Sequence, residues 1–199
     1  MINELNKNGF VHLTNQTENQ LQEIINSLGE IIMTTDVVVK KESKGLVTTS
    51  HGIEFHTDHH KAKFVAWYCF KQTDKGGDSL LLDAENIYVE LPIDIQENLK
   101  SVYVFEHKIY EDDKDNYPFV EIGANNNLQF HCSLVNDKDK ENPAFIYFKR
   151  LMNKAEPIKI RLQKSDILII DNHRIFHGRT PILGSKDRYL KRFWIKSEK

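Results

Sequence analysis

Short runs of apolar and β-branched residues, separated by turn residues, dominate the hydrophobic pattern of this chain. Such runs predict strands at residues 10–13, 37–39, 64–70, 79–82, 102–109, 119–122, 128–132, 158–162, 166–170 and 188–195. The run at 64–70 is apolar on both faces, which indicates a central strand. The Gly-Gly turn at 76–77 predicts that this strand forms an antiparallel hairpin with the strand at 79–82.

Fewer segments show the spacing or the start signals of helices. A capping box at Thr17–Gln20 begins one helix, which Gly29 ends. Two short helices are predicted at 84–91 and 93–100, and Pro143 begins a longer one. The last third of the chain lacks the regular alternation of a doubly wound fold. The pattern therefore predicts a mainly β protein with flanking helices, built as a double-sheet sandwich or jelly roll.

Composition narrows the class of protein further. With 199 residues, 40% hydrophobic and 28% charged, the chain is predicted to form a single domain over residues 1–199. The net charge of −2 indicates neither a nucleic acid nor a membrane surface as partner. Cys69 and Cys132 lack metal-binding spacing, so two buried reduced thiols are expected. No signal peptide or membrane span is visible, so we expect a cytoplasmic protein. The pattern indicates no oligomeric state.

His56 and Asp58, two residues apart in the stretch Ile53–His60, are candidate metal ligands. On an extended strand they point to the same face and can bind one ion, while Thr57 points away. A third candidate, His177, follows an apolar strand and a polar turn. Two histidines and one carboxylate form the facial ligand set of non-haem Fe(II) oxygenases. The pattern predicts that folding returns His177 to the other two residues.

Further polar residues suggest a bound carboxylate. Arg188 and Arg192 lie four residues apart in a β-prone segment after His177, and arginine suits bidentate binding of carboxylates. Their spacing places both on one face of a strand, in one cavity or on the surface. Ser79, in the turn Gly76–Ser79, has a hydroxyl that can share a carboxylate with an arginine.

Together these motifs resemble the TauD/TfdA (taurine dioxygenase-like, clavaminate synthase-like) family of Fe(II)- and 2-oxoglutarate-dependent oxygenases. The sequence contains, in the family's order, the HxD pair at 56–58, the GGDS turn at 76–79, the distal His177 and then Arg188. The resemblance extends over roughly residues 8–196. The chain is shorter than is usual for the family, so reduced lid or substrate-binding insertions are expected.

The resemblance implies a double-stranded β-helix, a cupin-like jelly roll, with Fe(II) held at one mouth. His56, Asp58 and His177 would be the iron ligands. Related halogenases have a small residue in place of the carboxylate. The presence of Asp58 therefore favours hydroxylation, or desaturation, over halogenation.

The resemblance also implies roles for the co-substrate residues. Arg188, with help from Ser79, would bind the far carboxylate of 2-oxoglutarate. Arg192 matches a second family arginine that lies near the co-substrate or an anionic group of the primary substrate. The implied reaction uses O2, releases succinate and CO2, and hydroxylates an unactivated C–H bond. Because the chain is short and lacks nucleic-acid or membrane signatures, we expect a small substrate: a free or carrier-bound amino acid, or a derivative.

Two other interpretations stay open. Glu54–His60 has the rhythm of the metallo-β-lactamase motif HxHxDH, with Glu54 in place of the first histidine. Asp58–His60 also matches the centre of the DHH phosphoesterase motif. Both would imply a binuclear metallohydrolase. A jelly-roll binding protein without turnover is the other alternative, in which Ser79 and Arg188 would have no purpose.

Several polar residues are expected to have ordinary structural roles. His59 and His60 either line the mouth of the pocket or face solvent, and solvent is predicted for at least one of them. The acidic run Glu111–Asp115 is predicted to be a solvated loop rather than a lid for a cationic substrate group. His131 is expected to be an ordinary hydrogen-bonded side chain.

Overall fold

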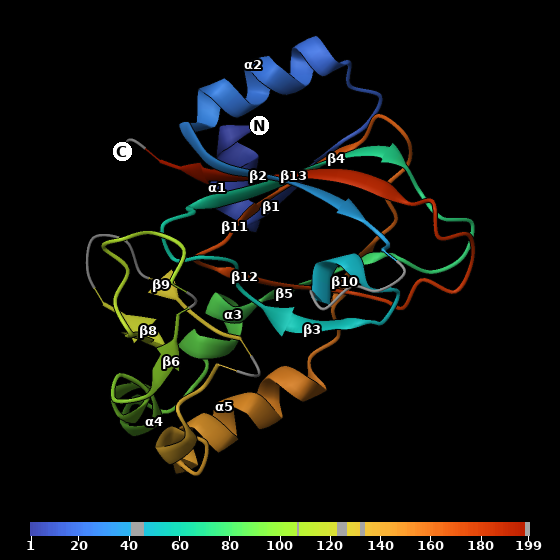
Figure 1. The fold of residues 1–199 in the computed structure, drawn as a ribbon. Coiled ribbons are helices and arrows are strands. Elements are labelled where there is room, and N and C mark those ends of the chain that lie inside the picture. Colours follow the sequence, from blue (N-terminus) through green and yellow to red (C-terminus); the bar gives the residue numbers. More distant parts are fainter. Residues whose placement is uncertain (41–45, 107, 123–126, 132–133, 198–199) are drawn as a thin grey trace.

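The apolar runs form two antiparallel sheets that face each other (Figure 1). The structure is a computed structural model that describes residues 1–40, 46–106, 108–122, 127–131 and 134–197. In spatial order, the larger sheet contains β1 (Phe10–Leu13), β11 (Ile167–Asp171), β4 (Phe64–Lys71), β13 (Tyr189–Lys196) and β2 (Glu30–Val38). The smaller sheet contains β10 (Ile158–Ile160), β5 (Ser79–Asp83), β12 (Ile175–Arg179) and β3 (Ile53–His56). The predicted mainly β jelly-roll class is confirmed.

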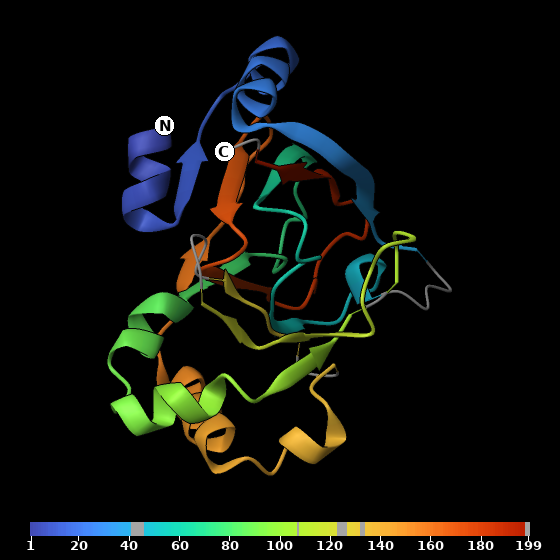
Figure 2. The same cartoon turned by 90° about the vertical axis from the view of Figure 1, so that its left-hand side faces the viewer.

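Helices cover the outer faces of this sandwich. The helices α1 (Ile2–Asn8) and α2 (Glu18–Leu28) pack on the larger sheet. The helices α3 (Ala84–Val89), α4 (Ile93–Leu99) and α5 (Pro143–Lys154) pack below the smaller one. Figure 2 shows α2 at one end of the molecule and α5 at the opposite end. The remaining elements are the two-stranded pairs β6 (Tyr103–Phe105) with β7 (Asn116–Pro118) and β8 (Val120–Glu121) with β9 (Asn127–Leu128), and the 3-10 helices η1 (Leu46–Thr48) and η2 (Asp137–Asp139).

Strand β11 shows how the layers are held together. Its residues alternate between two hydrophobic cores because successive side chains of a strand point to opposite faces. Leu168 and Ile170 pack in the core between the sheets, while Ile167 and Ile169 pack under α1 and α2. All four side chains are fully buried. The strand and the turn after it, which leads to β12, therefore lie in a rigid frame.

The predicted hairpin between the strands at 64–70 and 79–82 is wrong. Strand β4 pairs with β11 and β13, whereas β5 pairs with β10 and β12 in the other sheet. The segment between them crosses from one sheet to the other. Gly76 and Gly77 have φ values of 74° and 72°, which suit a sheet-to-sheet corner as well as a hairpin. The hydrogen-bonding partners of each strand are distant from it in sequence.

Other differences are local. Helix α1 was not predicted, and the strand predicted at 102–109 is limited to β6. Cys69 is buried and free, as expected, whereas Cys132 lies outside the described residues. Among the helices of the described residues, none is long and apolar enough to cross a membrane.

Candidate metal centre

The smaller sheet brings the three predicted ligands together. His56 ends β3, and His177 lies directly opposite it in the middle of β12. One ligand atom from each of His56, Asp58 and His177 lies within 4.8 Å of the other two. The distance from His177 Nε2 to Asp58 Oδ2 is 3.8 Å. Strand β3 ends at His56, before Asp58. The cluster is therefore formed by the cross-strand pair of His56 and His177 together with the turn that carries Asp58, and not by one continuous strand.

The two imidazoles are in the state that a metal requires. His56 Nδ1 lies 2.8 Å from the carbonyl oxygen of Glu54. A carbonyl only accepts, so Nδ1 carries the proton and Nε2 keeps its lone pair. Burial lowers the pKa of His56 and lowers the pKa of His177 well below its ordinary value. Neutral histidines can bind a cation without first losing a proton.

The carboxylate of Asp58 is held in its ionised form. Burial opposes ionisation, but the charge of Arg192 and the hydrogen bond from Trp194 favour the ionised form, and the pKa of Asp58 lies below its usual value. Arg192 Nη1 donates to both carboxylate oxygens, at 2.9 and 3.0 Å. Trp194 Nε1 donates to Oδ2 at 2.8 Å. Arg192, expected near the co-substrate or substrate, thus also contacts a predicted metal ligand.

Neighbouring residues explain the local backbone. Thr57 points away from the cluster, as expected, and its hydroxyl accepts from the backbone N–H of Phe130 at 3.1 Å. Gly178, next to His177, lets β12 approach β3 closely. A Cβ at this position would lie 2.7 Å from the carbonyl oxygen of Ile53. Both features keep His56 and His177 in register.

Sequence reasoning missed Asn172, which lies in the turn between β11 and β12. Its side chain is fully buried. Its Oδ1 accepts from the backbone N–H of Asp58 at 2.7 Å, and its Nδ2 donates to the carbonyl oxygen of Ala62 at 2.9 Å. The only hint in the sequence was a polar residue directly after a buried strand.

A cavity adjoins the cluster. It is lined by Ser79, His177, Arg188 and Arg192, among others. Arg188 is 3% exposed, and its Nε donates to Gln72 Oε1 at 3.0 Å. Burial, with the nearby charge of Arg179, lowers the pKa of Arg188 to about 10. The two predicted arginines therefore share one cavity instead of lying on the surface.

Arg179 is a second residue that sequence reasoning did not select for this cavity. It lies two positions after His177 on β12 and lines the same cavity. Its guanidinium donates to the carbonyl oxygens of Val47, Thr49 and His51. Its Nε is buried and has no hydrogen-bond partner among the described residues. Burial lowers its pKa to about 10. The two-residue periodicity of a strand was the available signal.

The Gly-Gly turn packs against Arg188. Gly77 has a φ of 72°, and a Cβ there would lie 2.9 Å from Thr73 Cγ2 and 3.2 Å from Arg188 Cδ. A larger residue would therefore push on the Arg188 side chain. This contact connects the GGDS turn to the cavity beside the predicted metal ligands.

A second cavity adjoins His56 and Asp58. Its other lining residues are Val47, Ile53, Thr57, His59, Glu106, Ile109, His131, Leu134, Arg192 and Trp194. The ring of His131, expected to be structurally ordinary, lies 5.3 Å from that of His56 between centroids. The cluster thus borders two cavities, one rich in arginine and one of mixed character.

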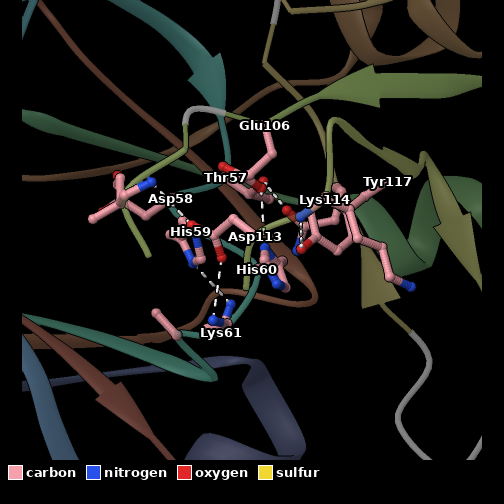
Figure 3. A network of polar contacts seen from close by, with 12 residues as sticks. Thr57, Asp58, His59, His60, Lys61, Glu106, Asp113, Lys114 and Tyr117 are labelled. Carbon is pink, nitrogen blue, oxygen red and sulfur yellow. Dashed lines mark hydrogen bonds and ion pairs between the residues drawn. The ribbon is translucent and has the colours of Figure 1, made fainter. Parts of the chain in front are cut away.

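The acidic run packs against the HTDHH stretch (Figure 3). His59 Nε2 and Asp113 Oδ2 are 2.9 Å apart, and His60 Nδ1 and Glu106 Oε2 are 3.2 Å apart. The side chains of His59 and His60 are only 1% and 15% exposed. The prediction that at least one of them faces solvent is therefore wrong. The solvated-loop prediction is wrong for Asp113, which is buried. Besides the contact with His59, its carboxylate accepts hydrogen bonds from two backbone N–H groups, including that of Tyr110.

His59, His60 and Asp113 also have ligand atoms within 4.8 Å of one another. However, the ammonium of Lys61 lies 3.2 Å from Asp113 Oδ1 and also pairs with Asp112. A resident cation on the carboxylate opposes binding of a metal ion. This group therefore gives no support to a binuclear hydrolase site.

A jelly roll that brings two histidines and one carboxylate together has the ligand set typical of non-haem Fe(II) oxygenases. The Taurine catabolism dioxygenase TauD, TfdA family matches residues 1–194. The chain belongs to this family. Family membership also removes the basis for the hydrolase interpretation.

Two individual relatives match the chain at low sequence identity. The chain is 26% identical over 211 residues to gamma-butyrobetaine dioxygenase of Homo sapiens, and equally to that of Pongo abelii. Each match covers 89% of this chain and 54% of the relative, so the chain spans about half the length of these relatives.

Solved structures support the fold. Asparagine oxygenase has a TM-score of 0.78 at 15% identity, covering 98% of this chain and 77% of that one. The protein PvcB of Pseudomonas aeruginosa has a TM-score of 0.71 at 14% identity, covering 99% and 79%. The non-heme iron oxygenase OrfP, in complex with Fe and alpha-ketoglutaric acid, has a TM-score of 0.69 at 18% identity, covering 91% and 64%.

Proposed function

We propose that this protein is an Fe(II)- and 2-oxoglutarate-dependent dioxygenase that hydroxylates an unactivated C–H bond of a small, amino-acid-like substrate, with release of succinate and CO2. The observation that carries the proposal is the position of the buried cluster of His56, Asp58 and His177 beside a cavity lined by buried arginines. Family membership supports the same conclusion.

The donor set fits ferrous iron. Two neutral imidazoles and one ionised carboxylate would occupy one face of the ion, which leaves the other positions for 2-oxoglutarate and O2. When bound, these groups supply the oxidising chemistry, while the protein orients them and limits the access of water. The presence of Asp58 supports hydroxylation rather than halogenation.

The charge of the first cavity fits 2-oxoglutarate. Arg188 and Arg179 make hydrogen bonds only to uncharged oxygens, and within the described part of the chain neither forms an ion pair. A buried cation without a counter-charge is unfavourable, so a dianion would be bound strongly here. In this proposal Arg188 and Ser79 bind its far carboxylate, and Arg179 adds positive charge.

The names of the relatives support an amino-acid-like substrate. Gamma-butyrobetaine dioxygenase, asparagine oxygenase, and OrfP, solved with (3S)-hydroxy-L-Arg, all act on or bind small molecules with charged or amide groups. The second cavity would receive the substrate. It adjoins His56 and Asp58 and shares His56 and Arg192 with the arginine-rich cavity.

Anaerobic titration with Fe(II) and 2-oxoglutarate tests the proposal. We expect a weak visible metal-to-ligand charge-transfer band that is lost in His177→Ala and weakened in Arg188→Ala. Arg150→Ala, which changes an exposed arginine on α5, should leave it unchanged. Succinate release in air would then identify substrates. Iron binding without a band or turnover would support a jelly-roll binding protein. A preference for zinc, with hydrolysis of a phosphodiester or lactam, would contradict the family's chemistry in this chain.

A further inference from the structure

Two charged side chains that line the second cavity each have a polar atom without a hydrogen-bond partner among the described residues. Glu106, directly after β6, and Arg192, on β13, both line it together with His56 and Asp58. The inference that follows rests on the proposed function, because it concerns the substrate of the same site and the chemical group of that substrate that would contact Glu106.

Glu106 is a largely buried carboxylate that forms no ion pair with a lysine or arginine of the described residues. Its side chain is 13% exposed, and its hydrogen bond is the one between Oε2 and His60 Nδ1. Its other carboxylate oxygen makes no hydrogen bond within the described residues. Of the lysines in this region, Lys61 pairs with Asp112 and Asp113, and Lys108 pairs with Asp115. A buried carboxylate of this kind is stabilised by a cationic partner.

Arg192 provides the opposite charge beside the predicted metal ligands. It is 8% exposed and uses Nη1 for Asp58, while its buried Nε has no partner among the described residues. Apolar side chains complete the cavity lining, among them Ile109, Leu134 and Trp194. The cavity therefore offers a cation, an apolar wall and an anion within one space.

We propose that Glu106 determines substrate specificity by binding a positively charged nitrogen of the primary substrate. The substrate would then be zwitterionic, with its anionic group near Arg192 and a side-chain or terminal amine, guanidinium or quaternary ammonium group at Glu106. His60, which donates to Glu106 and lies tilted against Tyr117 with ring centroids 3.7 Å apart, positions the carboxylate (Figure 3).

Matched pairs of probes test this assignment. The pairs are L-arginine and L-citrulline, L-lysine and L-norleucine, and gamma-butyrobetaine and the carboxylic acid in which a tert-butyl group replaces its trimethylammonium group. Each is titrated anaerobically into the protein with Fe(II) and 2-oxoglutarate, and the change in the charge-transfer band gives the dissociation constant. For at least one pair, we expect the cationic member to bind about 10- to 100-fold more tightly, as a charged hydrogen bond predicts.

Variants then place the effect at Glu106. In Glu106→Gln the preference should fall to roughly threefold or less, while the band with 2-oxoglutarate persists and shows an intact centre. Glu111→Gln, at an exposed acid of the same segment, should keep the full preference. Equal responses to both members of every pair, no response to any probe, or an unchanged preference in Glu106→Gln would overturn the assignment. Absence of the band in the unmodified protein would instead refute the proposed function itself.

Discussion

The side chain of Asn172 accepts a hydrogen bond of 2.7 Å from the backbone N–H of Asp58. Its amide nitrogen donates to the carbonyl oxygens of Asp58 and His59, both at 3.3 Å, and of Ala62 at 2.9 Å. Asn172 belongs to the turn that leads into β12 and His177. One buried side chain therefore connects the two segments that carry all three predicted ligands.

Substitution of Asn172 should weaken the metal centre more than the fold. In Asn172→Asp one acceptor remains but the amide donors are lost. We expect Fe(II) affinity to fall about 10- to 100-fold, as is typical for residues that orient metal ligands. Anaerobic calorimetry with Fe(II) measures the affinity, and thermal unfolding reports stability. Asn153→Asp, on the exposed face of α5, is the control. Unchanged Fe(II) affinity with a lowered melting temperature would show a purely structural role.

Arg188 should act on the co-substrate and leave iron affinity intact. Arg188→Ala removes a buried guanidinium from the arginine-rich cavity, so 2-oxoglutarate binding should lose about 2–4 kcal/mol, or roughly 30- to 700-fold. Arg188→Lys should recover only part of this, because an ammonium lacks the planar fork that matches a carboxylate. The dissociation constant follows from the charge-transfer titration. Equal losses of Fe(II) and 2-oxoglutarate binding would argue against a role specific to the co-substrate.

Gly178 should be intolerant of even one methyl group. In Gly178→Ala the new Cβ would approach the carbonyl oxygen of Ile53 to 2.7 Å, which forces β12 away from β3. We expect a loss of about 1–3 kcal/mol in the free energy of unfolding and weaker Fe(II) binding, because the His56–His177 pair spans these strands. Denaturant unfolding and Fe(II) titration measure the two effects. Wild-type values for both would contradict the close-approach argument.

Asp113 should make stability depend on pH. Burial disfavours its charge, but N–H donors from Tyr110, His59 and Ile109 outweigh burial and hold its pKa well below the ordinary value. Because the folded pKa is lower than the unfolded value of about 3.9, the ionised group stabilises the fold above that pH, and this contribution decreases as the pH falls further.

Asp113→Asn should therefore be less stable by about 1–3 kcal/mol at neutral pH, and the difference should shrink below about pH 4. Urea unfolding over a pH series measures this change. Asp112→Asn removes the exposed partner of Lys61 and should change stability by less than about 1 kcal/mol throughout. A difference for Asp113→Asn that stays constant across the pH series would contradict the linkage.

The local pattern of the sequence determined the jelly-roll class, most strands and the identities of the three predicted metal ligands. These properties follow from residue type and two-residue periodicity, which depend on neighbours along the chain. The same periodicity relates Arg179 to His177, but sequence reasoning did not select Arg179, because only the chemistry of the cavity makes that residue significant.

Tertiary structure alone decided which strands pair, where buried polar side chains meet and which charges remain unpaired. Three features depend on segments that are distant in sequence: the strand partners of β4 and β5, the hydrogen bond between Asn172 and Asp58, and the contact of the buried Asp113 with His59. A turn motif or a charge run has the same local signature whether it is buried or exposed. Only the packing of both sheets places Glu106 and Arg192 in one cavity beside the predicted metal ligands, because their positions depend on strands and loops that sequence spacing does not relate.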